Sequence, residues 1–390
     1  MENLPRILET YIESKKFPGI EWIIKLDEKK YSGSIGYLNL ENKEKLNANC
    51  SYRIWSMTKP IISIVILQLI EEKKIKFEDP INLYLPSFNN LKVLKENAKS
   101  IEDIKNVENN PTIKDLLLHT AGFSYNFLGD IIAEEYHNIG LFYSNESTLE
   151  KEIDTLSNIP LLYEPGTRWV YSVSVDILAR IIEVVENTSL EFQLKKRIFD
   201  PLEMHNTGFS INVNNQKLMK SYHYNNVNKK LVKPDVNPRY ISNYGYPINV
   251  KNFARGGIGL YSTANDYLLF AEMLQRGLSQ KGEKIISIEM LKNATQNQIS
   301  KSFLPYQIKN FDIKVLDENV FESYGWGYGF RVHLQNNNFN NKGEFGWGGA
   351  ANTYFLVDPK YKLSAVLMTQ VFQGDPNLHK DFYNYIYSQL

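Results

Sequence analysis

The stretch YRIWSMTKP, residues 52–60, places a serine three residues before a lysine, at the start of an apolar run over residues 61–70. If a helix begins at Ser56, Lys59 lies one turn further along on the same face, because residues three and four apart are neighbours on a helix. A hydroxyl beside an amine at the positive end of a buried helix is a candidate activated nucleophile. The spacing therefore predicts a catalytic pair.

The same spacing also has a purely structural interpretation. Serine is a favoured residue at the beginning of a helix, and Pro60 suits a first turn. With this content of serine and lysine, about two S-x-x-K matches would occur by chance. Further motifs are therefore needed before the pair can be given a function.

Composition excludes several classes of protein. The chain has 390 residues, and its 44 basic and 44 acidic residues give zero net charge, so we expect no nucleic-acid or anionic-membrane partner. The single cysteine, Cys50, excludes disulfides within the chain and C-x-x-C motifs. No H-E-x-x-H occurs and the six histidines are scattered, so neither a metal nor a cofactor is expected. Without a signal region or a long enough apolar run, we expect a cytoplasmic protein.

The order of strand and helix patterns predicts an α/β fold of the α+β type. Strand patterns at both ends of the chain should form one antiparallel sheet flanked by helices, with the helix after Ser56 against it. We expect residues 1–79 and 250–390 to form this sheet domain, and residues 80–249 a mostly helical inserted domain. Ser56 then lies at their junction, where pockets often form. The expected strands are 20–26, 30–40, 326–334, 344–347, 351–357 and 363–369. The expected helices of the middle section include 113–119, 125–143 and 149–156.

Other chemical motifs find little support. The G-x-S-x-G turn of α/β-hydrolases is absent. Gly346, Gly348 and Ala351 match a loose dinucleotide-binding pattern, but a strand rather than a helix is expected next, at residues 353–357. His119, in the segment LHTAG, could be a catalytic base, although a structural histidine at a helix end is the favoured interpretation.

Three segments, in order, match the motifs of a known family. The first is S-x-x-K at Ser56 and Lys59, the second is Tyr171 in a loop that begins EPGT, and the third is WGG at residues 347–349 ahead of a strand. With these segments, nearly the whole chain resembles the penicillin-recognising serine hydrolases, in particular the class C β-lactamase-like family and its carboxylesterase branch. The resemblance implies a β-lactamase/DD-peptidase-like fold and an acyl-enzyme mechanism.

The resemblance also implies roles for individual residues. Ser56 would be the nucleophile, assisted by Lys59 and Tyr171, and either of these two could be the first base. The backbone N–H groups of Ser56 and Ala350 would form the oxyanion hole. Aromatic side chains would line an apolar pocket, although they could instead belong to the hydrophobic core. Two glycines beside them would let the strand lie close to the serine. The substrate-binding candidates are Trp347, Gly348, Gly349, Tyr125, Trp326 and Phe127.

Two departures from the family pattern bear on the substrate. Val173 stands where the family has an asparagine that binds the acylamino side chain of β-lactams, and Trp347 replaces the motif lysine. Both changes favour a small-molecule ester as the substrate. A β-lactamase, a D-amino-acid peptidase, an acyltransferase and a non-catalytic binding protein of the same fold remain alternatives.

Overall fold

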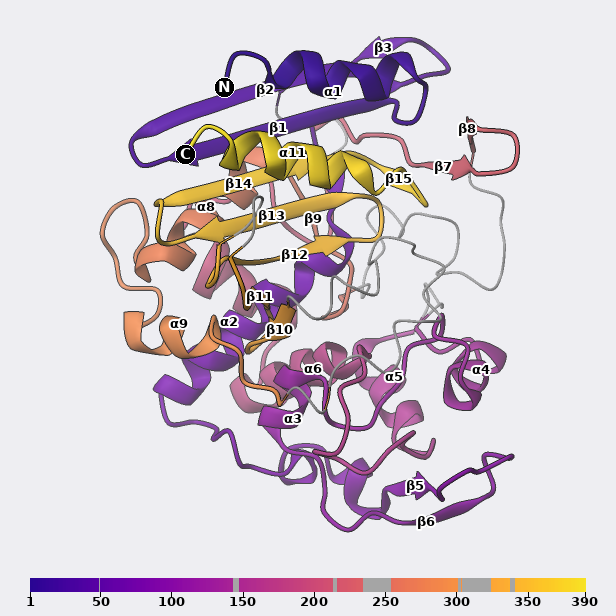
Figure 1. Cartoon of the computed structure of the whole chain (residues 1–390). Helices are drawn as coiled ribbons and strands as arrows, with labels where there is room; N and C mark the ends of the chain where they lie inside the picture. The colour runs from indigo at the N-terminus through magenta and orange to yellow at the C-terminus, as the bar shows by residue number, and fades with distance from the viewer. Residues whose placement is uncertain are drawn as a thin grey trace.

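An antiparallel sheet built from both ends of the chain forms the upper part of the molecule in Figure 1. The computed structural model describes residues 1–48, 50–142, 147–212, 216–233, 254–300, 303, 324–336 and 341–390. The strands of this sheet are β1 (Gly19–Leu26), β2 (Lys29–Asn39), β3 (Glu44–Lys45), β10 (Tyr324–Trp326), β11 (Arg331–His333), β12 (Phe345–Gly349), β13 (Thr353–Asp358) and β14 (Leu363–Met368). Within the described residues the sheet has eight strands in the order β10-β11-β12-β13-β14-β1-β2-β3. The expected sheet from both chain ends is confirmed.

Helices cover both faces of this sheet. On one face lie α1 (Leu4–Glu13) and α11 (Asn377–Tyr387), and on the other α8 (Ala264–Arg276) packs against β1, β13 and β14. Alternate side chains of β14 therefore enter different cores: Leu367 packs with the α1 and α11 side, and Val366 packs with the α8 side. A strand buried on both faces reads as a continuous apolar run, which explains the sequence of β14.

The helix that follows the serine stretch is α2 (Thr58–Glu71), and it is buried on every side from Thr58 to Leu69. It packs mainly on α6 (Ser174–Glu186) rather than on the sheet, because α8 already occupies that face. The expected contact between this helix and the sheet is made instead by the short turn η1 (Trp55–Met57), which packs against β12 and β13. Ser56 thus lies between the sheet and the helices.

The middle section is mostly helical, with one expected helix much shorter than its pattern. In place of residues 125–143, the structure has α4 (Ile131–Asn138), because the Asp130 carboxylate accepts hydrogen bonds from the backbone N–H groups of Ile132 and Ala133 and so starts the helix there. Residues 125–129 remain a loop. The other helices are α3 (Ile113–Leu118), α5 (Leu149–Leu156), α7 (Leu190–Leu194) with its π-helical continuation η4 (Lys195–Phe199), and α9 (Ile288–Ala294).

Several short strands were not expected as such. The expected strand at residues 326–334 is instead the end of β10, a turn and β11, and the two strands form a hairpin over residues 324–333, since the chain turns at Gly329, whose φ is +90°. Residues 92–106 contain a further short two-stranded antiparallel ribbon. The proposed domain boundary at residues 249–250 lies outside the described residues, so the division into two domains stays a prediction. The remaining elements are β4 (Tyr52–Arg53), β5 (Lys92–Leu94), β6 (Ile104–Asn106), β7 (Tyr222–Asn225), β8 (Lys230–Val232), β9 (Tyr261–Ser262), β15 (Val371–Phe372), η2 (Ile81–Leu83) and η3 (Pro86–Asn90).

Candidate active site

Ser56 and Lys59 meet where η1 runs into α2. Trp55 takes a left-handed backbone conformation, with φ +48°, and this turn presents the partly exposed Ser56 beside the first turn of α2. Lys59 is 1% exposed, and its Nζ lies 3.1 Å from Ser56 Oγ. The amine also donates a hydrogen bond of 2.7 Å to the carbonyl oxygen of Gly257. Pairing of β4 with β9 ties the serine stretch to the loop that contains this glycine.

The environment of Lys59 favours its neutral form. Burial lowers the pKa of Lys59 from 10.5 to about 7, and the opposite charge of Asp176 counteracts part of this shift. Near neutral pH a substantial fraction of the amine is therefore unprotonated and able to accept a proton. A serine hydroxyl at hydrogen-bond distance is the group from which it could take one.

Tyr171 brings a phenol to the same place from the loop before α6. Its side chain is 4% exposed, its ring centre lies 4.8 Å from Lys59 Nζ, and it shares a hydrogen bond with Ser56. Trp347 Nε1 donates a second hydrogen bond to its hydroxyl, at 3.3 Å. Burial raises the pKa of Tyr171 above its ordinary value, and the hydrogen bonds from Ser56 and Trp347 oppose the rise. At neutral pH the group is a phenol rather than a phenolate.

The end of β12 lies directly beside the serine turn. A Cβ added to Gly349 would stand 2.5 Å from the carbonyl oxygen of Ile54, so only glycine allows this approach. Gly348 has a different reason, since a Cβ there would meet the ring of Tyr354 on the neighbouring strand at 2.3 Å. Ala350 follows immediately and is exposed. Its backbone N–H as part of an oxyanion hole stays a prediction.

The aromatic candidates differ in exposure. Trp347 keeps part of its surface accessible, as does Phe127, whose ring stacks on Tyr125 at 4.5 Å between centres. Trp326 is 3% exposed and Tyr125 is 4% exposed, so both lie behind the accessible surface. The ring of Trp326 meets that of Trp347 edge-on, at 4.7 Å and 89°. Contact of these side chains with a substrate stays a prediction. Trp347 and Phe127 are the two whose exposure would allow it.

Two groups contribute to the surroundings of Lys59 in a way that the sequence did not indicate. Asp176, in the first turn of α6, is 3% exposed and accepts a hydrogen bond of 2.9 Å from the N–H of Gly257. Burial raises the pKa of Asp176, and the Gly257 N–H and the Lys59 charge oppose the rise. The hydroxyl of Tyr125, a pocket candidate from the sequence, lies 3.4 Å from Lys59 Nζ. The contact between the Gly257 carbonyl and Lys59 joins residues far apart in the sequence, and no local pattern indicated it.

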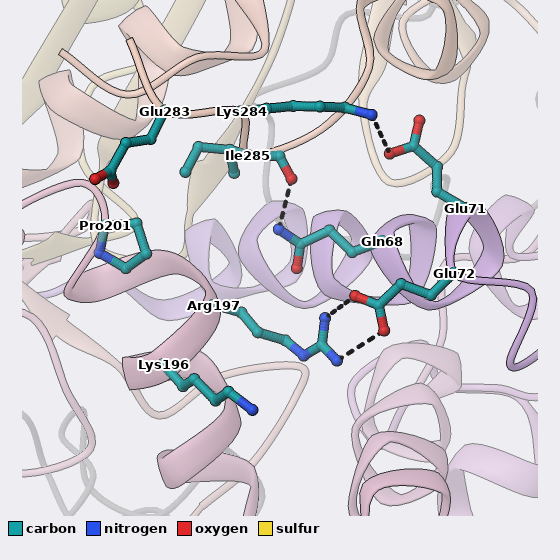
Figure 2. Close-up of a pocket in the computed structure, with 9 residues that line it drawn as sticks. All are labelled: Gln68, Glu71, Glu72, Lys196, Arg197, Pro201, Glu283, Lys284 and Ile285. Carbon is teal, nitrogen blue, oxygen red and sulfur yellow. Dashed lines mark hydrogen bonds and ion pairs between the residues drawn. The ribbon is translucent and has the colours of Figure 1, made fainter. Parts of the chain in front are cut away.

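A hollow at the opposite end of α2 is lined mostly by charged side chains (Figure 2). Its volume is about 420 Å³. Arg197 forms a two-pronged ion pair with Glu72, at 2.6 and 3.1 Å, and the Gln68 amide donates to the carbonyl oxygen of Ile285. From Lys59 to Gln68 the helix rises about 14 Å at 1.5 Å per residue. This hollow is therefore separate from the candidate active site. Its lining residues are Gln68, Glu71, Glu72, Lys196, Arg197, Pro201, Glu283, Lys284 and Ile285.

Over the described ranges, no three histidine, cysteine or acidic side chains are grouped so that they could hold a metal ion. Among the helices of that same part of the chain, none combines the length and the apolar character needed to cross a membrane.

Comparison with known proteins places this chain in a family. Protein Rv1367c of Mycobacterium tuberculosis (strain ATCC 25618 / H37Rv) is 25% identical, with 89% of this chain and 83% of that protein covered. Esterase EstB of Burkholderia gladioli is 21% identical over 87% of this chain and 82% of its own. The solved structure of EstCE1, described as a hydrolase with promiscuous acyltransferase activity, matches with a TM-score of 0.80 at 22% identity, over 99% of this chain and 98% of that one. The model of the beta-lactamase family matches residues 4–388, and this chain therefore belongs to the beta-lactamase family.

Proposed function

We propose that this protein is a serine hydrolase that cleaves carboxylic esters of small molecules through an acyl-enzyme on Ser56. The observation that carries the proposal is the 3.1 Å distance between Ser56 Oγ and the buried amine of Lys59, whose pKa is lowered to about 7. A serine hydroxyl is a poor nucleophile unless a base stands beside it. The amine supplies that base at neutral pH.

The first half of the reaction forms the acyl-enzyme. Neutral Lys59 takes the proton of Ser56 as Oγ attacks the ester carbonyl, and the N–H groups of Ser56 and Ala350 stabilise the negative oxygen. Tyr171 then gives its proton to the departing alkoxide, which leaves as an alcohol. Lys59 is now an ammonium and Tyr171 a phenolate, a pair of opposite charges in a buried site. The choice of Lys59 as the first base follows from the directions of the two pKa shifts.

The second half returns both groups to their starting states. Water attacks the acyl carbon and passes a proton to the phenolate of Tyr171. When the tetrahedral intermediate collapses, Ser56 Oγ leaves with the proton held by Lys59, and the acid product is released. No proton is gained or lost by the enzyme over the cycle.

Neutral esters suit the site better than β-lactams. Trp347 contributes an apolar ring with one N–H, which is directed at the phenol of Tyr171 and not at a substrate carboxylate. Val173 has no side-chain amide, and its backbone N–H donates to the carbonyl oxygen of Ser124 at 3.2 Å. The relative from Burkholderia gladioli is named an esterase, which supports the same substrate class.

Hydrolysis of p-nitrophenyl acetate and butyrate by the purified protein tests the proposal. We expect turnover by the wild type and none by Ser56→Ala. Ser63→Ala is the matched control, because Ser63 is a buried serine on α2 whose hydroxyl has no hydrogen-bond partner among the described residues. This control should keep its activity. Full activity of Ser56→Ala would overturn the proposal.

The same assay separates the alternatives. EstCE1, the structural neighbour, is described as also transferring acyl groups, so an added alcohol or amine acceptor belongs in the panel. Acyl transfer that outruns hydrolysis would make the chain an acyltransferase. Faster turnover of nitrocefin or of D-amino-acid peptides than of esters would make it a β-lactamase or a peptidase. A fluorophosphonate probe that leaves Ser56 unlabelled would indicate a non-catalytic binding protein.

A further inference from the structure

A buried histidine holds the backbone on both sides of Tyr171. The carbonyl oxygen of His119 accepts a hydrogen bond of 2.9 Å from the N–H of Val170, the residue before the tyrosine. The Nδ1 of the same histidine accepts one of 3.2 Å from the N–H of Ser172, the residue after it. We propose that His119 is a positioning residue that fixes the phenol of Tyr171 against Ser56. This inference rests on the proposed function.

The histidine is itself rigidly placed. It ends α3 in the left-handed conformation, with φ +56°, where histidine is one of the few residues besides glycine that are found often. At the other end of α3, Thr112 and Asp115 form a reciprocal capping box. The His119 side chain is 1% exposed. Both acceptors of hydrogen bonds from the tyrosine loop therefore belong to a rigidly held residue.

The hydrogen bond from Ser172 also determines the protonation of the ring. A backbone N–H can only donate, so Nδ1 of His119 is the acceptor in this hydrogen bond, and a neutral ring then carries its proton on Nε2. The Ser172 hydroxyl, also 3.2 Å from Nδ1, is then a second donor to the same nitrogen. Burial, and after it the charge of Lys59, lowers the pKa of His119 well below its ordinary value, in keeping with a neutral ring. With Nδ1 occupied, the ring is not placed to serve as the general base that the sequence left open.

Contacts of the ring support the same role. Its centre lies 4.9 Å from that of Tyr171 and 5.3 Å from that of Trp326, so the imidazole packs against the phenol as well as bonding its backbone. Among the described residues, Nε2 is buried with no hydrogen-bond partner. A residue selected only to fill this space would be apolar, because an unpaired buried N–H is costly. An apolar residue could fill the space, but it could not accept the hydrogen bond that Nδ1 accepts from Ser172.

Two substitutions separate positioning from packing. His119→Asn keeps an acceptor at the δ position and tolerates the left-handed conformation, whereas His119→Leu has the same branching without an acceptor. For p-nitrophenyl butyrate, we expect His119→Leu to lower kcat about 10- to 100-fold with KM changed less than about 2-fold, since misplacing a catalytic group by 1 Å can cost about 100-fold. His119→Asn should stay within about 5-fold of the wild type. Equal losses in the two variants would contradict the proposal.

A double-mutant cycle shows whether the effect passes through the phenol. If it does, His119→Leu should cost less than about 2-fold when added to Tyr171→Phe, because the group that it positions is already gone. A full repeat of the loss in that background would overturn the inference. Wild-type turnover by Tyr171→Phe would instead overturn the proposed function, which separates the two failures.

A spectroscopic readout covers the case in which His119→Leu does not fold. In ¹⁵N-histidine-labelled wild-type protein, the signal missing from His119→Asn should show an unprotonated Nδ1 and a protonated Nε2 at neutral pH. The opposite tautomer or a doubly protonated ring would contradict the hydrogen bond from Ser172. This measurement does not depend on activity.

Discussion

Replacement of the buried Lys59 by methionine should stabilise the protein while abolishing its activity. Methionine has a similar length without the charge, so it fits the space occupied by the lysine side chain. The lysine pKa of about 7 in the folded protein, against 10.5 as its ordinary value, means that folding disfavours the ammonium. The wild type therefore loses folding free energy at neutral pH to keep a usable base in a dry site.

The size of this effect follows from the two pKa values. Between pH 7 and 10.5 the unfolded chain binds a proton at Lys59 that the folded chain does not, so the stability of the wild type rises with pH in this window. Proton linkage gives a destabilisation of about 4 kcal/mol at pH 7 and about 1 kcal/mol at pH 9.5. Removing the amine also leaves the Gly257 carbonyl without its 2.7 Å hydrogen bond, at a cost of about 1 to 3 kcal/mol. Lys59→Met should therefore be about 1 to 3 kcal/mol more stable than the wild type at pH 7.

The change of this stability difference with pH is the better test, because the cost of the lost hydrogen bond is the same at both pH values and cancels. The stability advantage of Lys59→Met should shrink by about 3 kcal/mol between pH 7 and pH 9.5. Urea unfolding followed by tryptophan fluorescence at the two pH values measures it. Lys114→Met, at an exposed lysine on α3, is the control and should show no such pH-dependent difference. An advantage for Lys59→Met that is equal at both pH values, or a loss of stability at pH 7, would refute the reasoning.

Three further predictions concern the rate of ester cleavage. The value of kcat/KM should rise with pH through about 7 as Lys59 loses its proton, and a profile that is flat from pH 5.5 to 8.5 would remove the lysine as the base. Trp347→Phe deletes the N–H that donates to the phenol at 3.3 Å, so kcat should drop about 2- to 10-fold in stopped-flow or steady-state assays; an unchanged kcat would show that this bond does not matter. Gly257→Ala would place a Cβ 2.4 Å from Asp176 Oδ2 and move the carbonyl that holds the lysine, lowering kcat/KM at least about 10-fold, whereas Gly208→Ala, with 3.6 Å of room, should match the wild type.

The sheet was predictable because its strands carry strong local patterns. The run LSAVLM of β14 was expected as a strand; the structure buries it on both faces, and its antiparallel partners come from the two chain ends as expected. The length of α4 was not predictable from its apolar pattern, since the side chain of Asp130 decides where the helix begins. The place of α2 also escaped prediction, because which helix takes the sheet face depends on competition with α8.

The candidate site likewise contains residues that the sequence predicts and contacts that it does not. Ser56 and Lys59 are close in sequence, and a single helical turn brings them together, so their spacing was enough to predict the contact between the two side chains. Tyr171 required the order of three motifs. The contacts of Gly257 with Lys59 and Asp176 join residues 198 and 81 positions apart, and no local pattern encodes such pairs. Only the folded backbone reveals which carbonyl holds the amine.

Capture of the covalent intermediate is the most direct test of the central claim, that Ser56 carries the acyl group. The Tyr171→Phe variant should accumulate it with p-nitrophenyl butyrate, because p-nitrophenolate leaves without needing a proton, so Ser56 and Lys59 still form the acyl-enzyme, whereas the attack of water is slowed without the phenolate that accepts its proton. Intact-protein mass spectrometry after acid quenching should then show one added butyryl group, mapped by peptide analysis to Ser56 and missing from Ser56→Ala. A butyryl group on any other residue, or ester turnover in Ser56→Ala, would contradict the account.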